Sequence, residues 1–568
     1  MKLIFDIEAD HLLEQVTKVW CIVARDVDTG QIYTFDPDEI EQGLDLLGKA
    51  DCLVGHNIID YDLRVLKKLY DFDYKGEVID TLVCTRTIWP NIVELDYQQG
   101  NFPQKLTGSH SLKAWGYRLG ELKDDFGGDS ESFGEYSSEM LTYCVQDTKV
   151  TEALYNKIQG KDFSPEALGL EHKLHTLLVQ QQERGFPFNV DEARKLHVQL
   201  EGRRSEIEQE LQDTFEPTIV ELKTKTKVIP FNPASRQQIA DRLMKRGWKP
   251  EEFTNTGEPK VDERVLSQIE MPEAKLLTEY LMLNKRIGQL ATGNQAWLKL
   301  EKEGRLHGRV NHMGAVTSRC TANNPNLQQV PSVSAPFGKE CRSLFHAPTG
   351  YSLLGADASG LELRCLGHYM AAYDAGEYAK EVVNGDIHSK NQESAGLPTR
   401  SNAKTFIYGF LYGAGDEKIG KIIGKGATEG RKIKSQFLKK TPALKKLREA
   451  ASKAAKNRGW LKGLDGRIIP IRHSHAALNT LLQSAGAIIC KTWYVQIEEL
   501  LRLHGYTRED VTIVAFIHDE VQLLVREGLE EEIGKLTKDA MWDVEELFKF
   551  RCPLDSEFKH GSTWADTH

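Results

Sequence analysis

Alternating apolar and polar residues predict a β-strand at the start of the chain. In the segment 2–9, KLIFDIEA, the acids Asp6 and Glu8 fall on one face and the apolar side chains on the other. A second apolar run at 52–54 predicts another strand, and the segment GHNIIDYD that follows it supplies Asp62. The pattern therefore places two acids on a first strand and one acid after a later strand.

Helical periodicity dominates the next part of the chain. The segment 140–150 is predicted to be a helix on which Tyr143 and Asp147 share a face, because they lie four residues apart. Two further helices are expected, one at 166–184 that is closed by a glycine and one at 190–215. Their length and charge suit a helical arm that grips a duplex.

Two apolar stretches in the second half of the chain each end in an acid. One, YSLLGAD, ends in Asp357. The other, VTIVAFIHDEVQLLV, is broken only by His518, Asp519 and Glu520, which predicts a hairpin with its acids at the bend. An acid at a strand end is most often a turn residue or a helix cap. If the strands lie side by side, however, Asp357 and Asp519 converge and could hold two Mg²⁺ ions about 4 Å apart.

The segment RSNAKTFIYGFLYGAG, residues 400–415, predicts a helix with side chains at steps of four. Arg400, Lys404, Tyr408 and Tyr412 fall on one face, so that two cations are followed by two aromatic rings. The cations suit a polyphosphate and a ring can stack on a base, which together describe a nucleotide. The alternative is an amphipathic helix with a solvated basic end and an aromatic stripe in the core.

The paired acids of the first strand also have two interpretations. Asp6 and Glu8 would repel one another unless a cation offsets their charge, and Mg²⁺ or Mn²⁺ with oxygen ligands is the usual solution. A surface strand with two solvated acids would show the same pattern. The neighbouring segments have to decide between these interpretations.

Charge is distributed unevenly along the chain. The formal net charge is −10, which at first argues against a nucleic-acid partner, but basic residues dominate 418–462 and a second basic cluster lies at 223–227. Acidic residues concentrate at 121–147 and 527–557. Each basic run alone is typical of a solvated helix face. Together they indicate a channel that follows a phosphate backbone within an acidic protein.

Length and composition favour a soluble, multidomain intracellular protein. At 568 residues the chain is too long for one hydrophobic core. Its nine cysteines include no C-x-x-C pair, so neither a disulfide framework nor a thiolate zinc site is indicated and a reducing compartment, the cytoplasm, is expected. The first residues lack the apolar core of a signal peptide, and no run approaches the ~18 apolar residues of a membrane span.

The acids and the tyrosine of the first part of the chain resemble a known set. This part is similar to the proofreading 3′–5′ exonuclease domain of the four-acid, tyrosine-containing type, which has an RNase H-like fold. Its five positions are filled by Asp6, Glu8, Asp62, Tyr143 and Asp147. The resemblance implies hydrolysis with two metal ions, held by Asp6, Glu8 and Asp147, while Tyr143 orients the attacking water. Asp80 is either a further structural acid or no part of the site.

The rest of the chain resembles the family A DNA polymerases. Three ordered motifs carry this resemblance: DASGLELR with Asp357, the pattern R-x₃-K-x₃-Y-x₃-YG from Arg400, and HDE with Asp519. Each motif alone is weak or moderate, whereas the ordered set behind an exonuclease-like region is specific. The family members that the chain resembles most are the replicative polymerases of short-tailed phages of the T-seven type.

The resemblance implies roles for the polymerase part. Asp357 and Asp519, with the carbonyl of Ala358, would hold two Mg²⁺ ions, for which Mn²⁺ could substitute, and Lys404 would assist phosphoryl transfer. The nucleotide-binding residues would be His388, Arg400, Lys404, Tyr408, Glu362 and Tyr412. The DNA-binding residues would be Arg319, Asn479, Gln483 and His518. Glu362 would crowd the position of a ribose 2′-hydroxyl.

The expected fold is multidomain and combines the α/β and α+β classes. An RNase H-like exonuclease domain precedes a right-hand polymerase domain of palm, fingers and thumb. The expected bounds are 1–162 for the exonuclease domain, 163–300 for the thumb and its connecting helices, 301–385 for the first part of the palm, 386–464 for the fingers and 465–568 for the second part of the palm.

The expected function is template-directed extension of a primer 3′ end with deoxynucleoside triphosphates, with 3′–5′ proofreading, in phage DNA replication. Primer-template DNA and deoxynucleoside triphosphates are the expected partners. A phage helicase-primase and a single-stranded DNA-binding protein are further candidates, and no membrane is expected. The link at 216–230 is too short for the insertion that docks host thioredoxin in the T-seven-type enzymes, so no dependence on thioredoxin is expected.

Two other functions share parts of this pattern. A single-subunit phage RNA polymerase has the acids and the arginine-lysine-tyrosine helix, but the exonuclease set and Glu362 argue against it. A DNA-binding clamp or structural subunit on a degenerate catalytic fold is the other alternative. Retention of the acids, cations and tyrosine of both sets argues against that decay.

Overall fold

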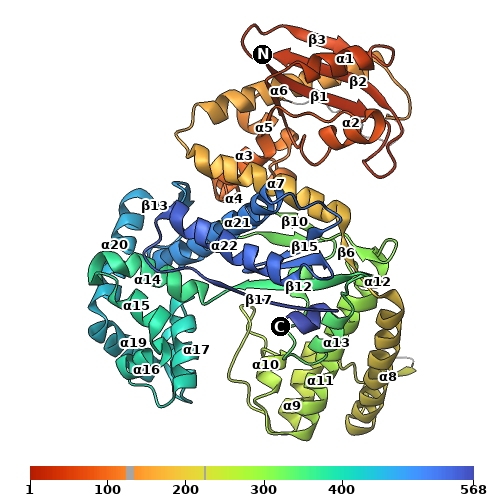
Figure 1. Ribbon diagram of the computed structural model, residues 1–568. Helices are drawn as coiled ribbons and strands as arrows, with labels where there is room; N and C mark the ends of the chain where they lie inside the picture. Colours follow the sequence, from red (N-terminus) through yellow and green to blue (C-terminus); the bar gives the residue numbers. More distant parts are fainter. Residues whose placement is uncertain (123–132, 223–224) are drawn as a thin grey trace.

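The computed structural model describes residues 1–122, 133–222 and 225–568 (Figure 1). Part of the acidic segment 121–147 and Lys223 of the basic cluster therefore lie outside the described residues. An N-terminal unit stands above a larger unit in Figure 1, and helix α7 (Pro165–Arg184) runs along the boundary between them.

The N-terminal unit is built on a five-stranded sheet in the order β3-β2-β1-β4-β5. The central strand β1 (Lys2–Ala9) pairs antiparallel with β2 (Val19–Asp26) and parallel with β4 (Cys52–Gly55). β3 (Ile32–Phe35) and β5 (Glu77–Asp80) form the edges. Because the central strands are buried along most of their length, both faces of the sheet must be covered by helices.

Six α-helices among the described residues complete this unit. They are α1 (Ile40–Gly48), α2 (Asp62–Tyr70), α3 (Thr81–Ile88), α4 (Ile92–Gln98), α5 (Leu112–Leu119) and α6 (Ser138–Gln159). The helix predicted at 140–150 thus lies within the 22-residue α6, which packs on β1 and β2. The side chain of Ser137 accepts a hydrogen bond from the N–H of Met140 and so caps the start of α6.

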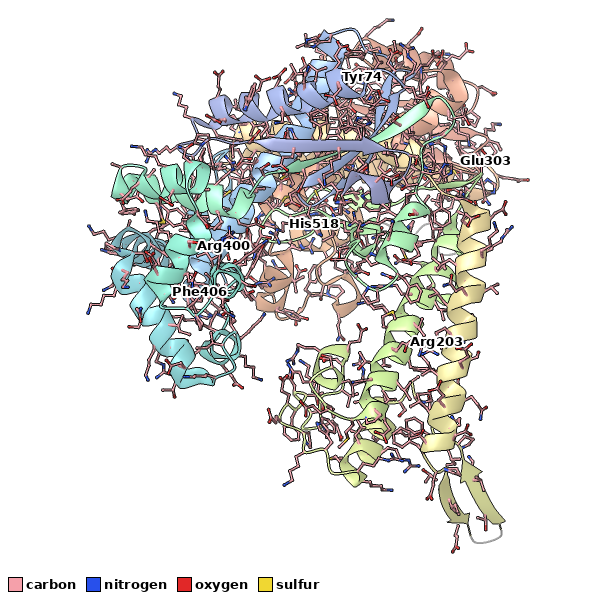
Figure 2. All side chains as sticks on the ribbon, turned by 60° about the horizontal axis from the view of Figure 1, so that its bottom comes forward. Tyr74, Arg203, Glu303, Arg400, Phe406 and His518 are labelled. Atoms are coloured by element: carbon pink, nitrogen blue, oxygen red, sulfur yellow. The ribbon has the colours of Figure 1, made fainter. Side chains whose placement is uncertain are left out.

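A long helical arm follows α7. Gly185, with a φ of 66°, ends α7 as the sequence predicts, and α8 (Val190–Thr214) packs along α11 (Pro272–Ile287). An ion pair of 2.8 Å between Arg203 and Glu279 joins these two helices. Figure 2 shows Arg203 on this arm, which stands apart from the helix that carries Arg400.

The segment predicted to be a short link between helices is a hairpin at the end of α8. Its strands β7 (Thr218–Leu222) and β8 (Lys225–Ile229) pair antiparallel, and Ile219 lies opposite Val228. The alternation of apolar residues in TIVEL and KTKVI is the sequence signal for these strands. The arm continues through α9 (Arg236–Lys245) and α10 (Glu263–Leu266).

The larger unit contains a four-stranded antiparallel sheet in the order β15-β16-β12-β17. Its strands are β12 (Tyr351–Ala358), β15 (Val511–Ile517), β16 (Glu520–Arg526) and β17 (Ser556–Gly561). Every residue of β15 and all but the last of β16 are buried, because helices cover the sheet as well. The largest hydrophobic cluster of the described residues includes Leu354, Ile513 and Leu523 from these strands.

Helices from two segments surround this sheet. α21 (Ala477–Leu503) and α22 (Glu530–Phe548) pack against one another, and α14 (Leu361–Asp374) follows β12. A helical subdomain follows. It comprises α15 (Glu377–Asn384), α16 (Ile387–Ala395), α17 (Arg400–Leu411), α18 (Asp416–Lys421), α19 (Ala427–Lys440) and α20 (Pro442–Arg458).

Short elements make up the connections. They are β6 (Phe186–Pro187), α12 (Trp297–Leu300), β9 (Arg305–Leu306), β10 (Arg309–Asn311), β11 (Thr321–Asn323), α13 (Gly338–Ser343), β13 (Trp460–Lys462) and β14 (Ile468–Pro470). The combination of α/β and α+β architecture agrees with the fold class expected from the sequence. Across the described ranges, we find no helix whose length and apolar character would let it cross a bilayer.

Candidate active sites

Asp357 and Asp519 meet where strand β12 of the four-stranded sheet ends. Asp357, the next-to-last residue of β12, lies opposite Glu520, the first residue of β16. Asp519 lies in the turn between β15 and β16, and its carbonyl oxygen accepts a hydrogen bond of 3.0 Å from the N–H of Ala358. The structure thus brings together the two acids that the sequence places far apart.

The sharp turn before β16 depends on one unusual backbone conformation. His518 has a φ of 55°, in the left-handed region that residues with side chains rarely adopt. The buried apolar strands on both sides hold this turn in place. Such strained residues concentrate at functional sites.

Both acids are difficult to ionise when no cation is bound. Burial, followed by the charge of Asp519, raises the pKa of Asp357 to about 7. Burial and the charge of Glu362 raise the pKa of Asp519 to about 6. Carboxylates that repel one another in a shared site are the oxygen donors that Mg²⁺ and Mn²⁺ prefer, so these residues fit such ions.

Glu520 has a different environment from its two neighbours. Its carboxylate accepts hydrogen bonds from the Trp564 indole at 2.7 Å and from the Gln522 amide at 2.6 Å, and His568 lies 3.2 Å from it. These contacts, chiefly His568, outweigh burial and hold the pKa of Glu520 below its ordinary value. Glu520 is therefore a satisfied structural acid, and sequence analysis did not identify its partners.

Helix α17 presents the predicted row of cations and rings, with one difference. Thr399 caps its start, and Arg400 and Lys404 are exposed while Tyr408 is half-buried. The helix ends at Leu411, and Tyr412 is its C-cap residue, whose N–H still donates a hydrogen bond of 2.9 Å to the carbonyl oxygen of Tyr408. Gly413 follows with a φ of 74°, the left-handed conformation that commonly ends helices.

Two residues of the preceding segment lie beside α17. Asp386, which caps α16, forms an ion pair of 2.9 Å with Arg400. The ring of His388 lies 6.3 Å from that of Tyr408, measured between centroids. The structure thus places His388 next to the row of cations and rings.

Tyr412 turns towards the acids. Its hydroxyl donates a hydrogen bond of 2.8 Å to Glu362 at the start of α14, and the guanidinium of Arg319 lies 6.0 Å from its ring centroid. These three residues line a cavity of about 230 Å³ together with His518 and Asp519. Five sequence-predicted residues from four separate segments therefore share one space. Figure 2 shows His518 between the helix that carries Arg400 and the helical arm.

The segment that carries Arg319 is fixed to α21. Ser318, with a φ of 64°, contacts the hydroxyl of Ser484 over 3.4 Å. On the same helix, the amide of Gln483 donates a hydrogen bond of 2.8 Å to Asn479. Arg319, Asn479 and Gln483 thus lie on two segments that contact each other.

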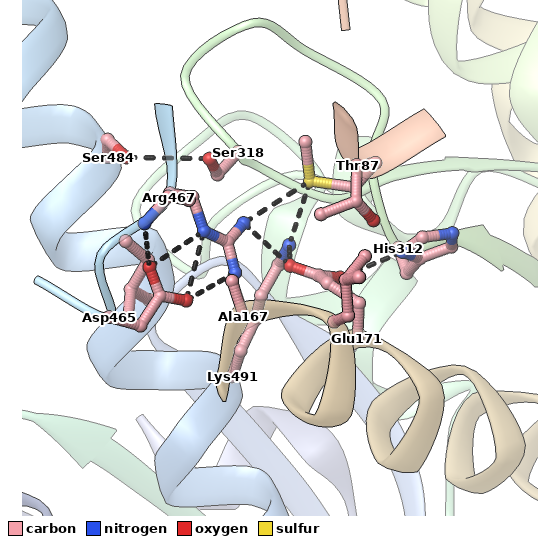
Figure 3. A network of polar contacts seen from close by, with 12 residues as sticks. Thr87, Ala167, Glu171, His312, Ser318, Asp465, Arg467, Ser484 and Lys491 are labelled. Atoms are coloured by element: carbon pink, nitrogen blue, oxygen red, sulfur yellow. Dashed lines mark hydrogen bonds and ion pairs between the residues drawn. The ribbon is translucent and has the colours of Figure 1, made fainter. Parts of the chain in front are cut away.

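A buried network of charges joins α7 to this region (Figure 3). Glu171 of α7 accepts hydrogen bonds from Arg467 at 2.7 Å and from Lys491 of α21 at 2.6 Å, and His312 lies 2.8 Å from its other oxygen. Asp465 provides a second carboxylate for Arg467. The nearby cations, Lys491 and Arg467, keep the pKa of Glu171 well below its ordinary value in spite of complete burial.

Sequence analysis did not identify this network. Its one local signal is Lys491, a lone cation inside the apolar run IICKTWYV. The other members come from distant segments, and nothing in their immediate sequence marks them as buried. Because removal of one partner from a buried ion pair leaves the other charge uncompensated, the network fixes the packing of α7, α21 and the Arg319 segment.

A second acidic centre lies on the N-terminal sheet. Asp6 and Glu8 lie on β1, and Asp62, the first residue of α2, accepts a hydrogen bond of 3.3 Å from the N–H of Ile7 between them. Tyr143 and Asp147 lie on α6, which packs on β1. The five residues of the predicted exonuclease set therefore converge on adjacent elements.

Electrostatics in this centre also favour a cation. Asp62 is almost completely buried, and burial, with added repulsion from Asp80 and Asp147, raises its pKa to about 7. Carboxylate oxygens of Asp6 and Glu8 lie within 4.8 Å of one another. These donors fit Mg²⁺ or Mn²⁺ as well.

Asp80 has a structural role beside this centre. Its carboxylate accepts hydrogen bonds from the N–H groups of Asn57 at 2.8 Å, Ile59 at 3.1 Å and Leu82 at 2.9 Å. It therefore caps α3 and holds the loop that leads to Asp62. Of the two interpretations left open by the sequence, the structural one applies.

Comparison with protein families gives a match to the family described as DNA polymerase family A, over residues 197–566. Two similar curated proteins are the DNA-directed DNA polymerases of Enterobacteria phage T3 and Escherichia phage T7. Each is 39% identical over 704 aligned positions that cover 100% of this chain and 100% of the relative. The expected similarity to polymerases of T-seven-type phages is confirmed.

A solved structure shares the fold at low sequence identity. It is the POL domain of Pol1 from M. smegmatis, in complex with DNA primer-template and dNTP. The TM-score is 0.77 at 17% identity, and the match covers 100% of this chain and 95% of that one. This likeness agrees with the expected right-hand polymerase fold.

Proposed function

The chain belongs to DNA polymerase family A, which makes it a DNA-directed DNA polymerase, and we propose that it extends primer 3′ ends by two-metal phosphoryl transfer and proofreads with a separate 3′–5′ exonuclease centre. The observation that carries the proposal is the meeting of Asp357 and Asp519 beside a cavity that Glu362, Tyr412 and Arg319 also line.

In the synthetic centre, the acids would bind metal ions and the basic side chains would bind the triphosphate. Asp357, Asp519 and the carbonyl of Ala358 would hold divalent cations, Mg²⁺ or Mn²⁺, which activate the primer 3′-hydroxyl and stabilise the departing pyrophosphate. Arg400 and Lys404 supply positive charge for the triphosphate, and this requires Arg400 to exchange its partner Asp386 for phosphate.

The remaining side chains of the cavity select and place the nucleotide and the DNA. His388 contributes to triphosphate binding, Tyr408 packs by the sugar and base, and Tyr412 lines the site by the template. Glu362 excludes a ribose 2′-hydroxyl. The contacts with DNA come from Arg319, Asn479, Gln483 and His518, of which Arg319 touches minor-groove acceptors that every correct base pair presents.

The N-terminal centre would remove nucleotides from a 3′ end. Asp6, Glu8 and Asp147 would hold divalent cations there, Asp62 would complete the acidic set, and Tyr143 would orient the attacking water. The sheet order with β1 at its centre supports the assignment of an RNase H-like domain. The proposed domain bounds remain 1–162, 163–300, 301–385, 386–464 and 465–568.

The biological setting is phage DNA replication in the host cytoplasm. A phage helicase-primase and a single-stranded DNA-binding protein are the proposed partners. Because the alignment with the T7 polymerase spans 704 positions and this chain has 568 residues, at least 136 positions lie opposite gaps in this chain. This supports the absence of a thioredoxin-docking insertion, so added thioredoxin should leave processivity unchanged.

One assay tests the proposal against its alternatives. Purified protein is given a labelled primer-template, Mg²⁺ and either deoxy- or ribonucleoside triphosphates. A DNA polymerase extends the primer with deoxynucleotides only, an RNA polymerase uses ribonucleotides, and a structural subunit extends nothing. The same labelled primer, incubated without nucleotides, reports 3′–5′ hydrolysis. A primer that stays intact would refute the proposed exonuclease activity.

A further inference from the structure

An ion pair connects the helical arm with the helical subdomain of α15–α20. Glu252, in the segment between α9 and α10, accepts a hydrogen bond of 3.2 Å from the Nζ of Lys421, the last residue of α18. In Figure 1 this segment lies on the side of the arm nearer to α17. The two residues are 169 positions apart, so no local sequence pattern marks their contact.

The position of Glu252 on the arm is fixed by its own neighbours. The N–H of Lys260 donates a hydrogen bond of 2.8 Å to the carbonyl oxygen of Glu252, and Phe253 pairs with Pro259 in an antiparallel bridge. The guanidinium of Arg264, on α10, donates to both carboxylate oxygens of Glu252. A carboxylate held in this bidentate manner has a defined direction, so the arm presents Glu252 to the subdomain in one orientation.

The contact between the two residues is weak enough to open. The side chains of Glu252 and Lys421 are 27% and 42% exposed, and an ion pair between side chains this exposed contributes little and is screened by salt. Lys421 also has a second carboxylate, that of Glu417, at 3.5 Å on its own helix. Lys421 can therefore leave Glu252 without losing every counter-charge.

The ion pair completes a closed path of protein around the synthetic centre. On β12, Leu353 packs into the hydrophobic cluster that includes α8 and α11, whereas Leu354, on the opposite face, packs into the cluster that includes α17 and α19. The arm and the subdomain thus extend from opposite faces of one sheet and meet again at Glu252 and Lys421. Figure 2 shows His518 of the synthetic centre between them.

We propose that Glu252 and Lys421 form a latch that opens to admit primer-template DNA and closes behind it, so that the bound DNA is released more slowly. The inference rests on the proposed polymerase function, which places DNA between the arm and the subdomain. Because the path is closed, DNA that lies within it leaves sideways only when the ion pair breaks. The latch would retain DNA in a chain that is proposed to lack the insertion for thioredoxin.

The rate at which the protein leaves DNA tests the latch. Removal of an acid near DNA should, by charge alone, strengthen binding to the polyanion and slow release. The latch predicts the opposite for Glu252→Ala, namely dissociation from primed DNA that is faster by roughly two- to fivefold, the range for an exposed ion pair. The single-turnover rate of nucleotide incorporation should stay the same.

Glu417→Ala is the matched control, because it removes the other acid beside Lys421 and leaves the contact with the arm. Its release from DNA should not be faster than that of the wild type. Slower or unchanged release in Glu252→Ala would overturn the proposal.

Cross-linking tests the closed path directly. Glu252→Cys and Lys421→Cys are combined and joined with a short bismaleimide, and protein with Glu252→Cys alone is treated in the same way as the control. Eight of the nine native cysteines are buried. Protein that is joined after it binds a primed DNA circle should stay on the circle at a salt concentration that removes the control, and should leave once the circle is cut.

Protein that is joined beforehand should bind linear primed DNA but fail to enter the circle. Release of the cross-linked protein from the intact circle would contradict the latch, and so would failure of the two cysteines to cross-link.

These measurements separate the latch from the proposed function. If the wild-type protein binds primed DNA but fails to extend the primer in Mg²⁺, the polymerase proposal fails, while retention on the circle still decides the latch. If primer extension is normal and the cross-linked protein leaves the intact circle, the latch alone fails.

Discussion

Asp357 and Glu520 lie opposite one another on adjacent antiparallel strands, yet their surroundings shift their pKa values in opposite directions. The pKa of Asp357 is raised to about 7, whereas that of Glu520 is lowered. The difference arises because Glu520 is contacted chiefly by His568 and also by Gln522 and Trp564, while Asp357 faces further acids. Opposed environments of neighbouring acids typically mark different roles. On the proposed mechanism, Asp357 would hold a cation, whereas Glu520 would support the turn that carries Asp519.

Trp564→Phe tests this support. The change keeps an aromatic ring in a fully buried position but removes the indole N–H that Glu520 accepts at 2.7 Å. We expect the free energy of unfolding to fall by about 1–3 kcal/mol and primer extension to drop several-fold, with hydrolysis unchanged. Denaturant titration and both assays measure this. Trp542→Phe, at an exposed tryptophan of α22, is the control, and an equally small effect in both variants would remove the support role.

Lys404→Ala should reduce the catalytic efficiency of deoxynucleotide use by on the order of 10²-fold or more, because positive charge is lost where negative charge gathers in phosphoryl transfer. Single-nucleotide incorporation kinetics measure this. Lys380→Ala removes another exposed lysine, on helix α15, and should change little. Wild-type efficiency in Lys404→Ala would rule out its contact with the triphosphate.

Glu362→Ala should raise ribonucleotide incorporation by roughly tenfold or more relative to deoxynucleotides, because the side chain that crowds the 2′-hydroxyl is removed. The same change releases Tyr412, whose hydroxyl now donates to Glu362. A competition assay with mixed nucleotides gives the ratio. Glu377→Ala, at an exposed glutamate of α15, provides the control. An unaltered sugar preference would mean that another residue excludes ribose.

His175→Phe should stabilise the protein increasingly as the pH falls. Burial, followed by the neighbouring His312, lowers the pKa of His175 from 6.5 to about 3. Below pH 6.5 the unfolded chain therefore binds a proton at His175 while the folded protein does not. The wild-type protein keeps its full stability above this pH and loses part of it as the pH falls towards 3.

Relative to wild type, the free energy of unfolding of His175→Phe should rise by about 1.4 kcal/mol for each pH unit of acidification over that range. It is measured as the difference in unfolding free energy between variant and wild type at pH 8, 6 and 4.5. His504→Phe, at an exposed histidine, should show no such trend. A difference that does not depend on pH would refute the buried neutral state of His175.

Strong local patterns predicted much of the fold. The strand at 2–9, the helices at 166–184 and 190–215 and the hairpin at the HDE motif lie within one or two residues of their predicted bounds. In these segments, periodicity, capping residues and turn residues all favour the same structure. Both acidic sets could be predicted because each member lies at the end of such an element or on one of its faces.

Other features depend on contacts that no local pattern contains. The ion network of Glu171, Arg467 and Lys491 joins segments hundreds of residues apart. Two of the partners of Glu520, Trp564 and His568, come from the last residues of the sequence. The helix predicted over 400–415 is shorter in the structure, because Gly413 adopts a left-handed φ of 74° and α17 ends at Leu411.

The central claim is that the chain has two separate acidic centres with opposite activities, and paired variants measured in both assays test it most directly. Asp519→Asn should reduce primer extension by on the order of 10³-fold or more and leave 3′–5′ hydrolysis intact, whereas Asp6→Ala should do the reverse. Glu557→Gln, which lies opposite Asp357 on β17 and is exposed, should retain both activities. Loss of both activities in either folded single variant would contradict the account.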